Sequence, residues 1–196
     1  MYNKSIFILS KNKIINSLIW KDSEFIAKTI HKWQIYWNWS DYYEWHIKPV
    51  KETWKELALL FNIKWKKLKD IEILCDLHDA IEDTDLKKED IEKLYWKILA
   101  NDCEALSIKK PNWTKKTKTV YYNNIKKNLK RKITKAADRF RNISKIPELK
   151  NKEKALKLYH KYLKEHPYYI KYNIIPDLLE WCLKEVEKNL KEKWRL

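Results

Sequence analysis

Apolar residues recur every three or four positions along most of this chain, and no long run alternates between apolar and polar residues. The first period is typical of amphipathic helices that bury one face, whereas strict alternation is typical of half-buried strands. The pattern predicts helices at Ser23–Tyr36, Lys48–Phe61, Lys67–Ile81, Lys87–Leu99, Thr119–Leu129, Arg131–Ile143, Lys152–Glu165 and Pro176–Lys191. The chain is therefore expected to form an all-α bundle.

Polar residues and prolines mark the expected helix ends. Asp85 precedes LKKEDIEKLYW and is expected to cap that helix. Pro147 and Pro167 predict breaks, because proline removes a backbone donor, and Lys145–Lys154 is a candidate linker. The last helix carries an apolar face, which predicts a packing helix, with a partner-binding helix as the alternative.

Composition and charge narrow the class of protein. A chain of 196 residues fits one domain with a real core. The formal charge of +16 comes mostly from lysine; either AT-rich codon usage or a surface for polyanions such as nucleic acid would explain it. The cysteines lack metal-type spacing, and the apolar run Ile6–Leu9 is too short for a signal peptide or a membrane span. A protein in the cytoplasm, without a membrane association, is expected.

Glycine is absent and tryptophan occurs eleven times, although an average chain carries about 7% glycine. The stretch HKWQIYWNWSDYYEWH, His31 to His46, has the polar composition of a loop but four tryptophans. Loops normally use glycine where the backbone needs positive φ. The tryptophans therefore stand where glycine is expected.

The strongest chemical signal is LHDAIEDTD, Leu77 to Asp85, where a histidine and four carboxylates end an apolar helix. An acidic helix end needs no metal, but a carboxylate near the core is costly unless it is paired or bound to one. His78 and Asp79 lie about 100° apart on a helix and could share a divalent cation. His31 and Asp138 are the candidates for completing the site, with satisfied core residues as the alternative.

These segments and several others resemble sequence motifs of the HD-domain metal-dependent phosphohydrolases. Within that family they resemble the RelA/SpoT-type hydrolases of guanosine tetra- and pentaphosphate. LHDAIEDTD resembles the family's HD-x-x-EDTD word, and KAADRFRNI, Lys135 to Ile143, resembles K-x-ADR-x-x-N. His31 with Gln34 resembles the family's H-x-G-Q word, and DYYEWH, Asp41 to His46, its tyrosine-to-histidine word. The resemblance spans roughly Ser23 to Ile146.

The resemblance implies a fold and a reaction. It implies an HD-domain helical bundle at residues 1–146, with C-terminal helices at residues 147–196 packing on the same domain. It also implies Mn²⁺-dependent hydrolysis of the alarmone 3′-diphosphate, giving pyrophosphate and GDP or GTP. The implied metal ligands are His31, His78, Asp79 and Asp138, and Glu82 and Asp83 would orient or deprotonate the attacking water. No part of the chain resembles the synthetase domain of the long bifunctional members of this family. The resemblance therefore implies a small stand-alone hydrolase.

Other residues of the family words are expected near the substrate. Lys135, Arg139 and Asn142 are candidates for holding phosphate or ribose, although the two charged residues could equally be exposed helix charges. His46 is expected to support the site or to pack in its loop. Tyr36 stands where the family usually has a basic residue that contacts the base, so an HD-domain hydrolase of another nucleotide is the first alternative. A non-catalytic basic nucleic-acid-binding module is the second, and oligomeric state is left open.

The same resemblance suggests an origin for the tryptophans. Trp33 stands at the glycine of H-x-G-Q, and Trp45 stands where relatives often have glycine before the histidine. Further tryptophans occupy expected turns or helix ends, namely Trp37, Trp39, Trp65, Trp96 and Trp113. The hypothesis is that most of them are UGA codons that the source reads as glycine. The alternative is an aromatic loop that stacks nucleobases.

Overall fold

The computed structural model describes residues 13, 15–36, 40–60, 62, 65–109 and 115–195. Its elements are α2 (Ser23–Ile30), the π-helix η1 (Tyr43–Ile47), α3 (Lys48–Leu60), α4 (Trp65–Asp76), α5 (Ala80–Asp83), α6 (Lys88–Leu94), α7 (Lys97–Leu106), α8 (Lys118–Lys126), α9 (Leu129–Ser144), the 3-10 turn η2 (Ile146–Glu148), α10 (Lys152–Tyr172) and α11 (Pro176–Trp194). The described residues contain no strand, only isolated bridges at Ile35–Asp41 and Lys109–Lys115. The predicted all-α class is confirmed.

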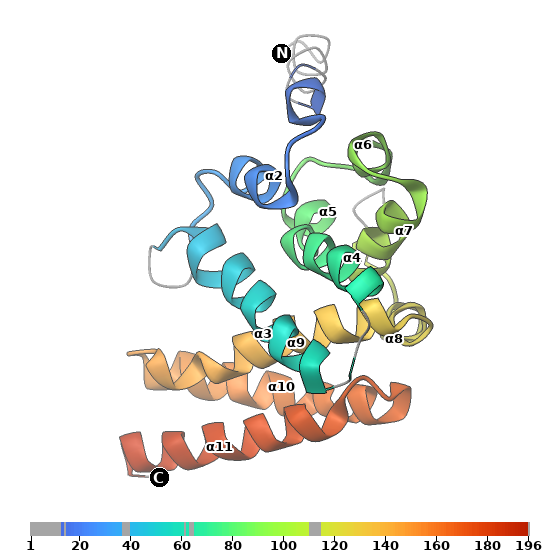
Figure 1. Ribbon diagram of the computed structural model, residues 1–196. Coiled ribbons are helices and arrows are strands. Elements are labelled where there is room, and N and C mark those ends of the chain that lie inside the picture. Colours follow the sequence, from blue (N-terminus) through green and yellow to red (C-terminus); the bar gives the residue numbers. More distant parts are fainter. Residues whose placement is uncertain are drawn as a thin grey trace.

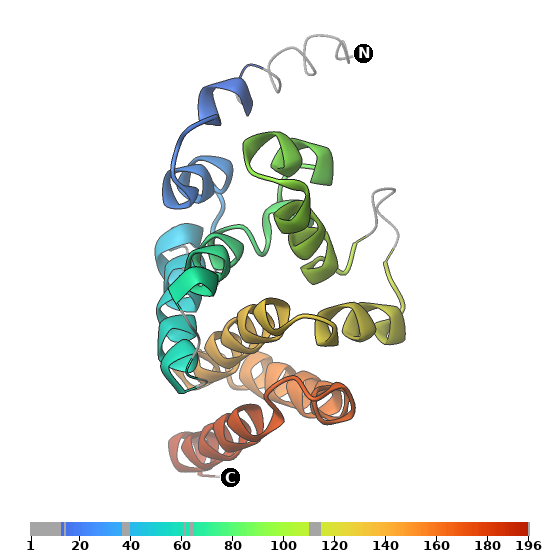
Figure 2. The same cartoon turned by 45° about the vertical axis from the view of Figure 1, so that its right-hand side comes forward.

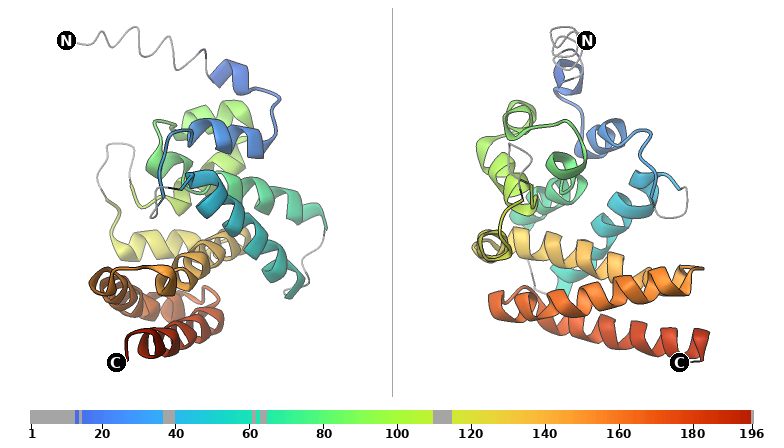
Figure 3. Two further views of the ribbon diagram at one scale, coloured as in Figure 1. Left: turned by 90° about the vertical axis from the view of Figure 1, so that its left-hand side faces the viewer. Right: turned by 180° about the vertical axis from the view of Figure 1, so that it is seen from behind.

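Helix α9 is the centre of the arrangement (Figure 1). It contacts α3 and α4 on one side and α11 on the other, so α10 and α11 form a layer beneath it in the views of Figure 3. Figure 2 shows the α2–α3 segment and the α6–α7 segment on opposite sides of the upper part of the molecule. No described helix is both long and apolar enough to cross a bilayer.

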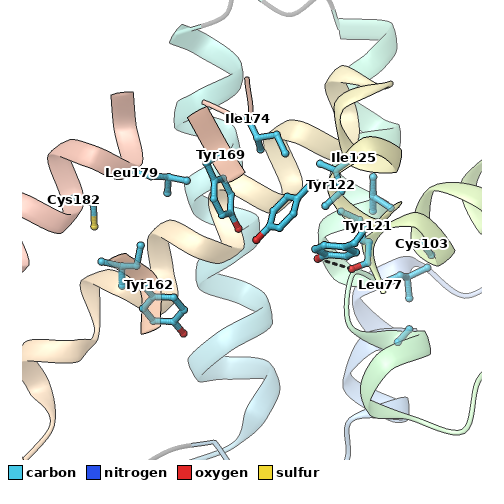
Figure 4. Close-up of a cluster of buried hydrophobic side chains, with 14 of the residues drawn as sticks. Leu77, Cys103, Tyr121, Tyr122, Ile125, Tyr162, Tyr169, Ile174, Leu179 and Cys182 are labelled. Carbon is cyan, nitrogen blue, oxygen red and sulfur yellow. Dashed lines mark hydrogen bonds between the residues drawn. The ribbon is translucent and has the colours of Figure 1, made fainter. Parts of the chain in front are cut away.

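One apolar core joins the early and late parts of the chain. Its buried side chains include Ile26 of α2, Leu99 of α7 and Leu183 of α11. Figure 4 shows the part of this core where Tyr122 of α8 lies beside Tyr169 of α10, with Ile174 and Leu179 close by. The expected linker Lys145–Lys154 contains η2, and its Ile146 is fully buried. The C-terminal helices therefore share the core of the residues before them.

Several expected helices are shorter than the apolar pattern predicted, and the one expected at Lys67–Ile81 is divided after Asp76 into α4 and α5. The helix expected at Ser23–Tyr36 ends at Ile30, and the following turn contains Trp33 at φ 78°. The helix expected at Lys87–Leu99 is divided into α6 and α7 at Tyr95, whose backbone leaves the helical region. Three- and four-residue spacing continues across these breaks, so periodicity alone could not detect them.

Two predictions about helix ends are wrong. The residue that caps α6 is Lys87 and not Asp85; its backbone N–H donates to Asp90 Oδ2 at 2.9 Å. Pro167 does not end a helix, because α10 continues through it to Tyr172. Interior proline costs about 3 kcal/mol. Tyr162, Tyr169 and Tyr172, buried on either side of Pro167, provide apolar burial that offsets this cost.

The tryptophans occupy several kinds of position. Trp20 and Trp33 have φ of 72° and 78° and are 96% and 85% exposed. Trp45 lies within η1 and Trp96 precedes α7, neither with positive φ, and Trp54 is buried. Trp37, Trp39 and Trp113 lie outside the described residues, as does the side chain of Trp65. Only Trp20 and Trp33, of the tryptophans described, have a backbone conformation that favours glycine.

Candidate metal centre

The HD dipeptide lies at the break between α4 and α5. Helix α4 ends at Asp76, and the next helical residue is Ala80, so His78 and Asp79 lie in a turn and not within a continuous helix. His78 Nδ1 lies 2.7 Å from the carbonyl oxygen of Cys75. Because a carbonyl only accepts, Nδ1 carries the hydrogen and the lone pair of a neutral ring is on Nε2. This arrangement is typical of a histidine ligand.

His46 reaches the same point from the π-helix η1. Its Nε2 lies 3.0 Å from Asp79 Oδ2 and 3.3 Å from His78 Nε2. His78 Nε2 is also 3.0 Å from that Asp79 oxygen. An extra residue per turn re-aims side chains, which is why short π-helices often occur at functional sites. Three donor atoms from two distant segments therefore converge.

Asp138 of α9 completes the group. Its Oδ1 lies 3.6 Å from His46 Nε2 and 3.9 Å from His78 Nε2. Donor atoms of His46, His78 and Asp79 all lie within 4.8 Å of one another, and all four residues are buried or nearly so. Two imidazole nitrogens with two carboxylates suit a first-row divalent cation. The residues present therefore fit a metal of that kind.

The charges within this group are strongly coupled. Burial by itself would lower the pKa of His78, but the Asp79 and Asp138 carboxylates raise it to about 9. Burial likewise opposes ionisation of Asp79, yet His78 and His46 hold its pKa well below the usual range. Burial disfavours the Asp138 carboxylate, and Lys135 and His78 lower its pKa to about 2. Positive charge is therefore strongly favoured at the point where the imidazoles meet.

His31 is not one of the three residues whose donor atoms converge, but its ring interacts electrostatically with Asp79 and His78. The side chain is 1% exposed, its Nδ1 lies 2.8 Å from Gln34 Oε1, and its ring stacks on Tyr42 at 4.9 Å. Its Nε2 has no hydrogen-bond partner among the described residues. Burial lowers the pKa of His31. His31 therefore holds its Nδ1 in a hydrogen bond, as His78 does, and keeps a buried Nε2 without a partner among the described residues.

Glu82 and Asp83 lie on α5, one turn after the HD dipeptide. Glu82 Oε2 accepts a hydrogen bond from the backbone N–H of Ile108 at 3.0 Å, and Lys109 donates to its carbonyl oxygen. Burial raises the pKa of both carboxyls, and the Asp79 charge adds to the effect on Asp83. Both residues line an open pocket of about 340 Å³ together with Gln34 and Lys109. Two carboxyls that hold protons readily therefore face an accessible space.

Tyr42 connects the carboxylates of Asp79 and Asp83. It was not among the residues singled out from the sequence. Its hydroxyl lies 2.8 Å from Asp79 Oδ2 and 3.0 Å from Asp83 Oδ2. Since a hydroxyl carries one hydrogen, it can donate to only one of these carboxylates at a time. The adjacent tyrosines in DYYEWH were visible in the sequence, but which of them faces the site depends on η1.

The K-x-ADR-x-x-N residues surround Asp138. Lys135 Nζ donates to Asp138 Oδ2 at 2.7 Å, and Asn142 Nδ2 donates to Oδ1 at 2.6 Å. The Tyr36 hydroxyl donates to Asn142 Oδ1 at 2.7 Å, and its ring stacks on His46 at 5.1 Å. Lys135 and Asn142 therefore lie beside Asp138, and Tyr36 reaches Asn142 from a distant segment.

The Arg139 side chain makes its contacts with α10. Its Nε donates to the Tyr169 hydroxyl at 3.0 Å, and its Nη2 lies 3.3 Å from Glu165 Oε2. The guanidinium also lies 4.6 Å from the centre of the Tyr162 ring. All three partners belong to α10. In this structure Arg139 connects α9 to α10.

Comparison with known proteins finds no matching family model and no matching curated protein. Among solved structures, one similar chain is described as a metazoan ortholog of SpoT that hydrolyzes ppGpp and plays a role in starvation responses. The two chains superpose with a TM-score of 0.54 at 20% identity, over 88% of this chain and 92% of the other. The chain has the fold of a SpoT-type ppGpp hydrolase.

The SpoT-type fold confirms the HD-domain bundle that LHDAIEDTD and KAADRFRNI suggested. It extends over most of both chains. At 20% identity, the likeness concerns the fold, and the chemistry of this chain has to be argued from its own side chains. Those side chains place a His/Asp group able to hold a divalent metal where η1, the α4–α5 turn and α9 meet.

Proposed function

We propose that the protein hydrolyses the 3′-diphosphate of guanosine tetra- or pentaphosphate. One water is consumed: its oxygen bonds to the phosphorus attached to the 3′ oxygen, that P–O bond breaks, and the 3′ oxygen takes up a proton. The products are pyrophosphate and GDP or GTP. The observation that carries the proposal is the convergence of His46, His78, Asp79 and Asp138 within the fold of a ppGpp hydrolase.

The proposed cation is Mn²⁺, held by His46, His78, Asp79 and Asp138, with His46 in the place that the family words suggested for His31. Mixed imidazole and carboxylate ligation suits Mn²⁺ among several first-row ions. A cation bound there supplies Lewis-acid chemistry, which polarises a phosphoryl oxygen and lowers the pKa of water from about 15.7 to about 7. His31 would then serve as a wall of the site, stacked on Tyr42.

Glu82 and Asp83 are the proposed groups that orient water and carry protons. Burial raises the pKa values of both carboxyls, which favours their protonated forms and suits groups that transfer protons. Asn142 and Tyr36 are proposed to contact ribose or base beside Asp138. Lys135 is proposed to balance Asp138 and attract phosphate, whereas Arg139 is proposed to act by holding α10. The proposed location is the cytoplasm, where nucleotide alarmones are free.

We also propose that Trp33 and Trp20 are glycines in the native protein, encoded by UGA. The support is conformational: both have positive φ, and neither ring is buried. The proposal does not extend to Trp54, because that ring is 3% exposed and packs in the core. Peptide mass spectrometry of native protein distinguishes glycine from tryptophan at position 33 directly.

The experiment for the function uses protein as written and protein with glycine at positions 20 and 33. Both are incubated with guanosine tetraphosphate and Mn²⁺, and pyrophosphate release is followed, with EDTA and His78→Ala as controls. Turnover that both controls abolish supports the proposal. A panel of other nucleotides, with products resolved by chromatography, tests the alternative substrates. Turnover only with one of these would show that guanosine tetraphosphate is not the substrate. No turnover of any nucleotide by folded protein would contradict the proposal that the protein is a hydrolase.

A further inference from the structure

The positive charge of the chain is concentrated in one segment. Residues 109–145 contain 14 lysines and arginines but one acidic residue, Asp138. The other 159 residues contain 29 basic and 26 acidic residues and are almost neutral. Codon usage would enrich lysine along the whole chain but would not remove acidic residues from one stretch. The segment comprises α8, α9 and the residues before α8.

The basic residues on α9 are mostly neutralised by carboxylates. Lys130 and Arg131 pair with Asp102 at 3.3 and 2.6 Å. Lys135 and Arg139 pair with Asp138 and Glu165, and Lys145, directly after α9, pairs with Glu148. These side chains have structural partners, so they contribute little free positive charge to the surface.

Four lysines on and around α8 differ from the basic residues of α9 because they are exposed and have no ion pair among the described residues. Lys115, Lys118, Lys126 and Lys127 are exposed, and the ion pairs found among the described residues include none of them. Each ammonium group is a strongly hydrated point charge that is available to an anion. The α8 helix therefore presents positive charge that carboxylates of the described chain do not balance.

The end of α10 extends this surface with aromatic rings and one more lysine. Helix α8 contacts α10, and Tyr122 of α8 stacks on Tyr168 and Tyr172 of α10. Figure 4 shows Tyr122 beside Tyr169 at this contact. Lys118 lies 5.1 Å from the Tyr168 ring, and Lys126 and Lys171 lie 5.5 and 5.6 Å from the Tyr172 ring. We call the surface made by Lys118, Lys126, Lys127, Tyr168 and Lys171 the α8–α10 basic surface.

We propose that the α8–α10 basic surface binds single-stranded nucleic acid through its phosphates, without reading sequence. The cations are all lysines, which contact phosphate as point charges, and the surface contains no arginine fork for base edges. Tyr168 stacks on Tyr122 and has Lys118 over its ring, so the exposed lysines make the proposed contacts with the flexible strand. A small alarmone would need cations beside Asp138, whereas these cations gather around Tyr168 and Tyr172.

The test measures binding of a fluorescein-labelled single-stranded oligouridylate of about 16 nucleotides, by anisotropy, between about 50 and about 200 mM salt. The variant replaces Lys118, Lys126, Lys127 and Lys171 by glutamine. A matched control replaces Lys152, Lys154, Lys157 and Lys188, which are also exposed lysines of α10 and α11. The full chain is used, and circular dichroism checks that each variant is folded.

The unchanged protein is expected to bind with a steep salt dependence. The α8–α10 variant should lose at least about tenfold in affinity at the higher salt, and its slope of log K against log salt should fall by roughly 3. The control should bind like the unchanged protein. No binding, equal losses in both variants, or binding only to anionic phosphatidylserine vesicles would overturn the proposal. Hydrolysis of guanosine tetraphosphate, measured in parallel, should be retained by the α8–α10 variant.

Discussion

At the level of single residues, two imidazole nitrogens face each other at 3.3 Å beside a shared carboxylate oxygen. Two neutral nitrogens at this distance need a proton or a cation between them, because lone pairs repel. Asp79 and Asp138 supply the compensating negative charge. His46 and His78 therefore meet directly, whereas His31 keeps a buried Nε2 without a partner among the described residues.

The proposed ligand set, which contains His46 but not His31, predicts different effects of two histidine substitutions. His46→Ala should weaken Mn²⁺ binding by at least about 100-fold, because it removes one of the converging donors, whereas His31→Ala should weaken it by less than about tenfold. Titration calorimetry of the folded variants with Mn²⁺ measures both affinities. A larger loss for His31→Ala would return that residue to the ligand set.

The hydroxyl of Tyr42 provides a second test at this scale. Tyr42→Phe removes the group between Asp79 and Asp83 but keeps the ring that stacks on His31. If the hydroxyl positions Asp83, kcat for guanosine tetraphosphate should fall by about tenfold or more, with little change in KM or Mn²⁺ affinity. An unchanged kcat would show that Asp83 needs no such support.

The backbone at Trp33 gives a prediction about stability. A residue with a Cβ in the left-handed region costs roughly 1–2 kcal/mol, and this ring is 85% exposed, so its removal loses little burial. Trp33→Gly should raise the free energy of unfolding by about 1 kcal/mol in urea titrations. Trp54→Gly is the matched control, because removing that buried ring should cost about 3–5 kcal/mol. Destabilisation by Trp33→Gly would contradict the strain argument.

At the level of helices, α10 holds a proline and a poorly satisfied histidine side by side. Both ring nitrogens of His166 are buried without a hydrogen-bond partner among the described residues. Pro167 interrupts the backbone ladder. The helix persists because its buried tyrosines pack against α8 and Arg139 binds Glu165 and Tyr169. Tertiary contacts therefore maintain a helix that local preferences oppose.

The pH dependence of stability follows from His166. Burial lowers its pKa from the ordinary value near 6.5, and Glu180 only partly opposes this. The folded state thus favours the neutral ring, so its contribution is complete above about pH 6.5 and is lost as pH falls. His166→Leu should reduce the loss of unfolding free energy between about pH 7 and about pH 5. An identical pH dependence in the variant would exclude His166 as a contributor.

At the level of the whole molecule, the metal centre joins segments that are far apart in the chain. His46 comes from η1, His78 and Asp79 from the α4–α5 turn, and Asp138 from α9. A ligand that binds only the folded state stabilises it by mass action. A metal bound by these residues would therefore stabilise the entire helical arrangement.

Metal removal should show this stabilisation. At a concentration of Mn²⁺ about 100 times its Kd, the gain is about 2.7 kcal/mol, so the melting temperature should rise with Mn²⁺ and fall with EDTA. In His78→Ala the Mn²⁺-dependent rise should be absent. Calorimetric scans of both proteins measure it, and an equal rise in the variant would place the stabilising ion elsewhere.

The sequence by itself determined what depends on nearby residues. Three- and four-residue periodicity is a local property of helices, so the all-α class and most helix positions were predictable. LHDAIEDTD and KAADRFRNI pointed to His78, Asp79 and Asp138 and to the HD-domain fold, because their letters lie within short words. Lys135 and Asn142 lie within about one turn of Asp138 on the same helix, so their contacts with it were likewise local.

Only the tertiary structure decided what depends on contacts between distant segments. The approach of His46 to Asp79, 33 residues away, depended on the π-helix η1. Arg139 proved to face α10 because Glu165 and Tyr169 lie there, and α10 passes through Pro167 because its neighbours stabilise it. Spacing along the chain carries no information about these partners, since packing brings them together after the helices form.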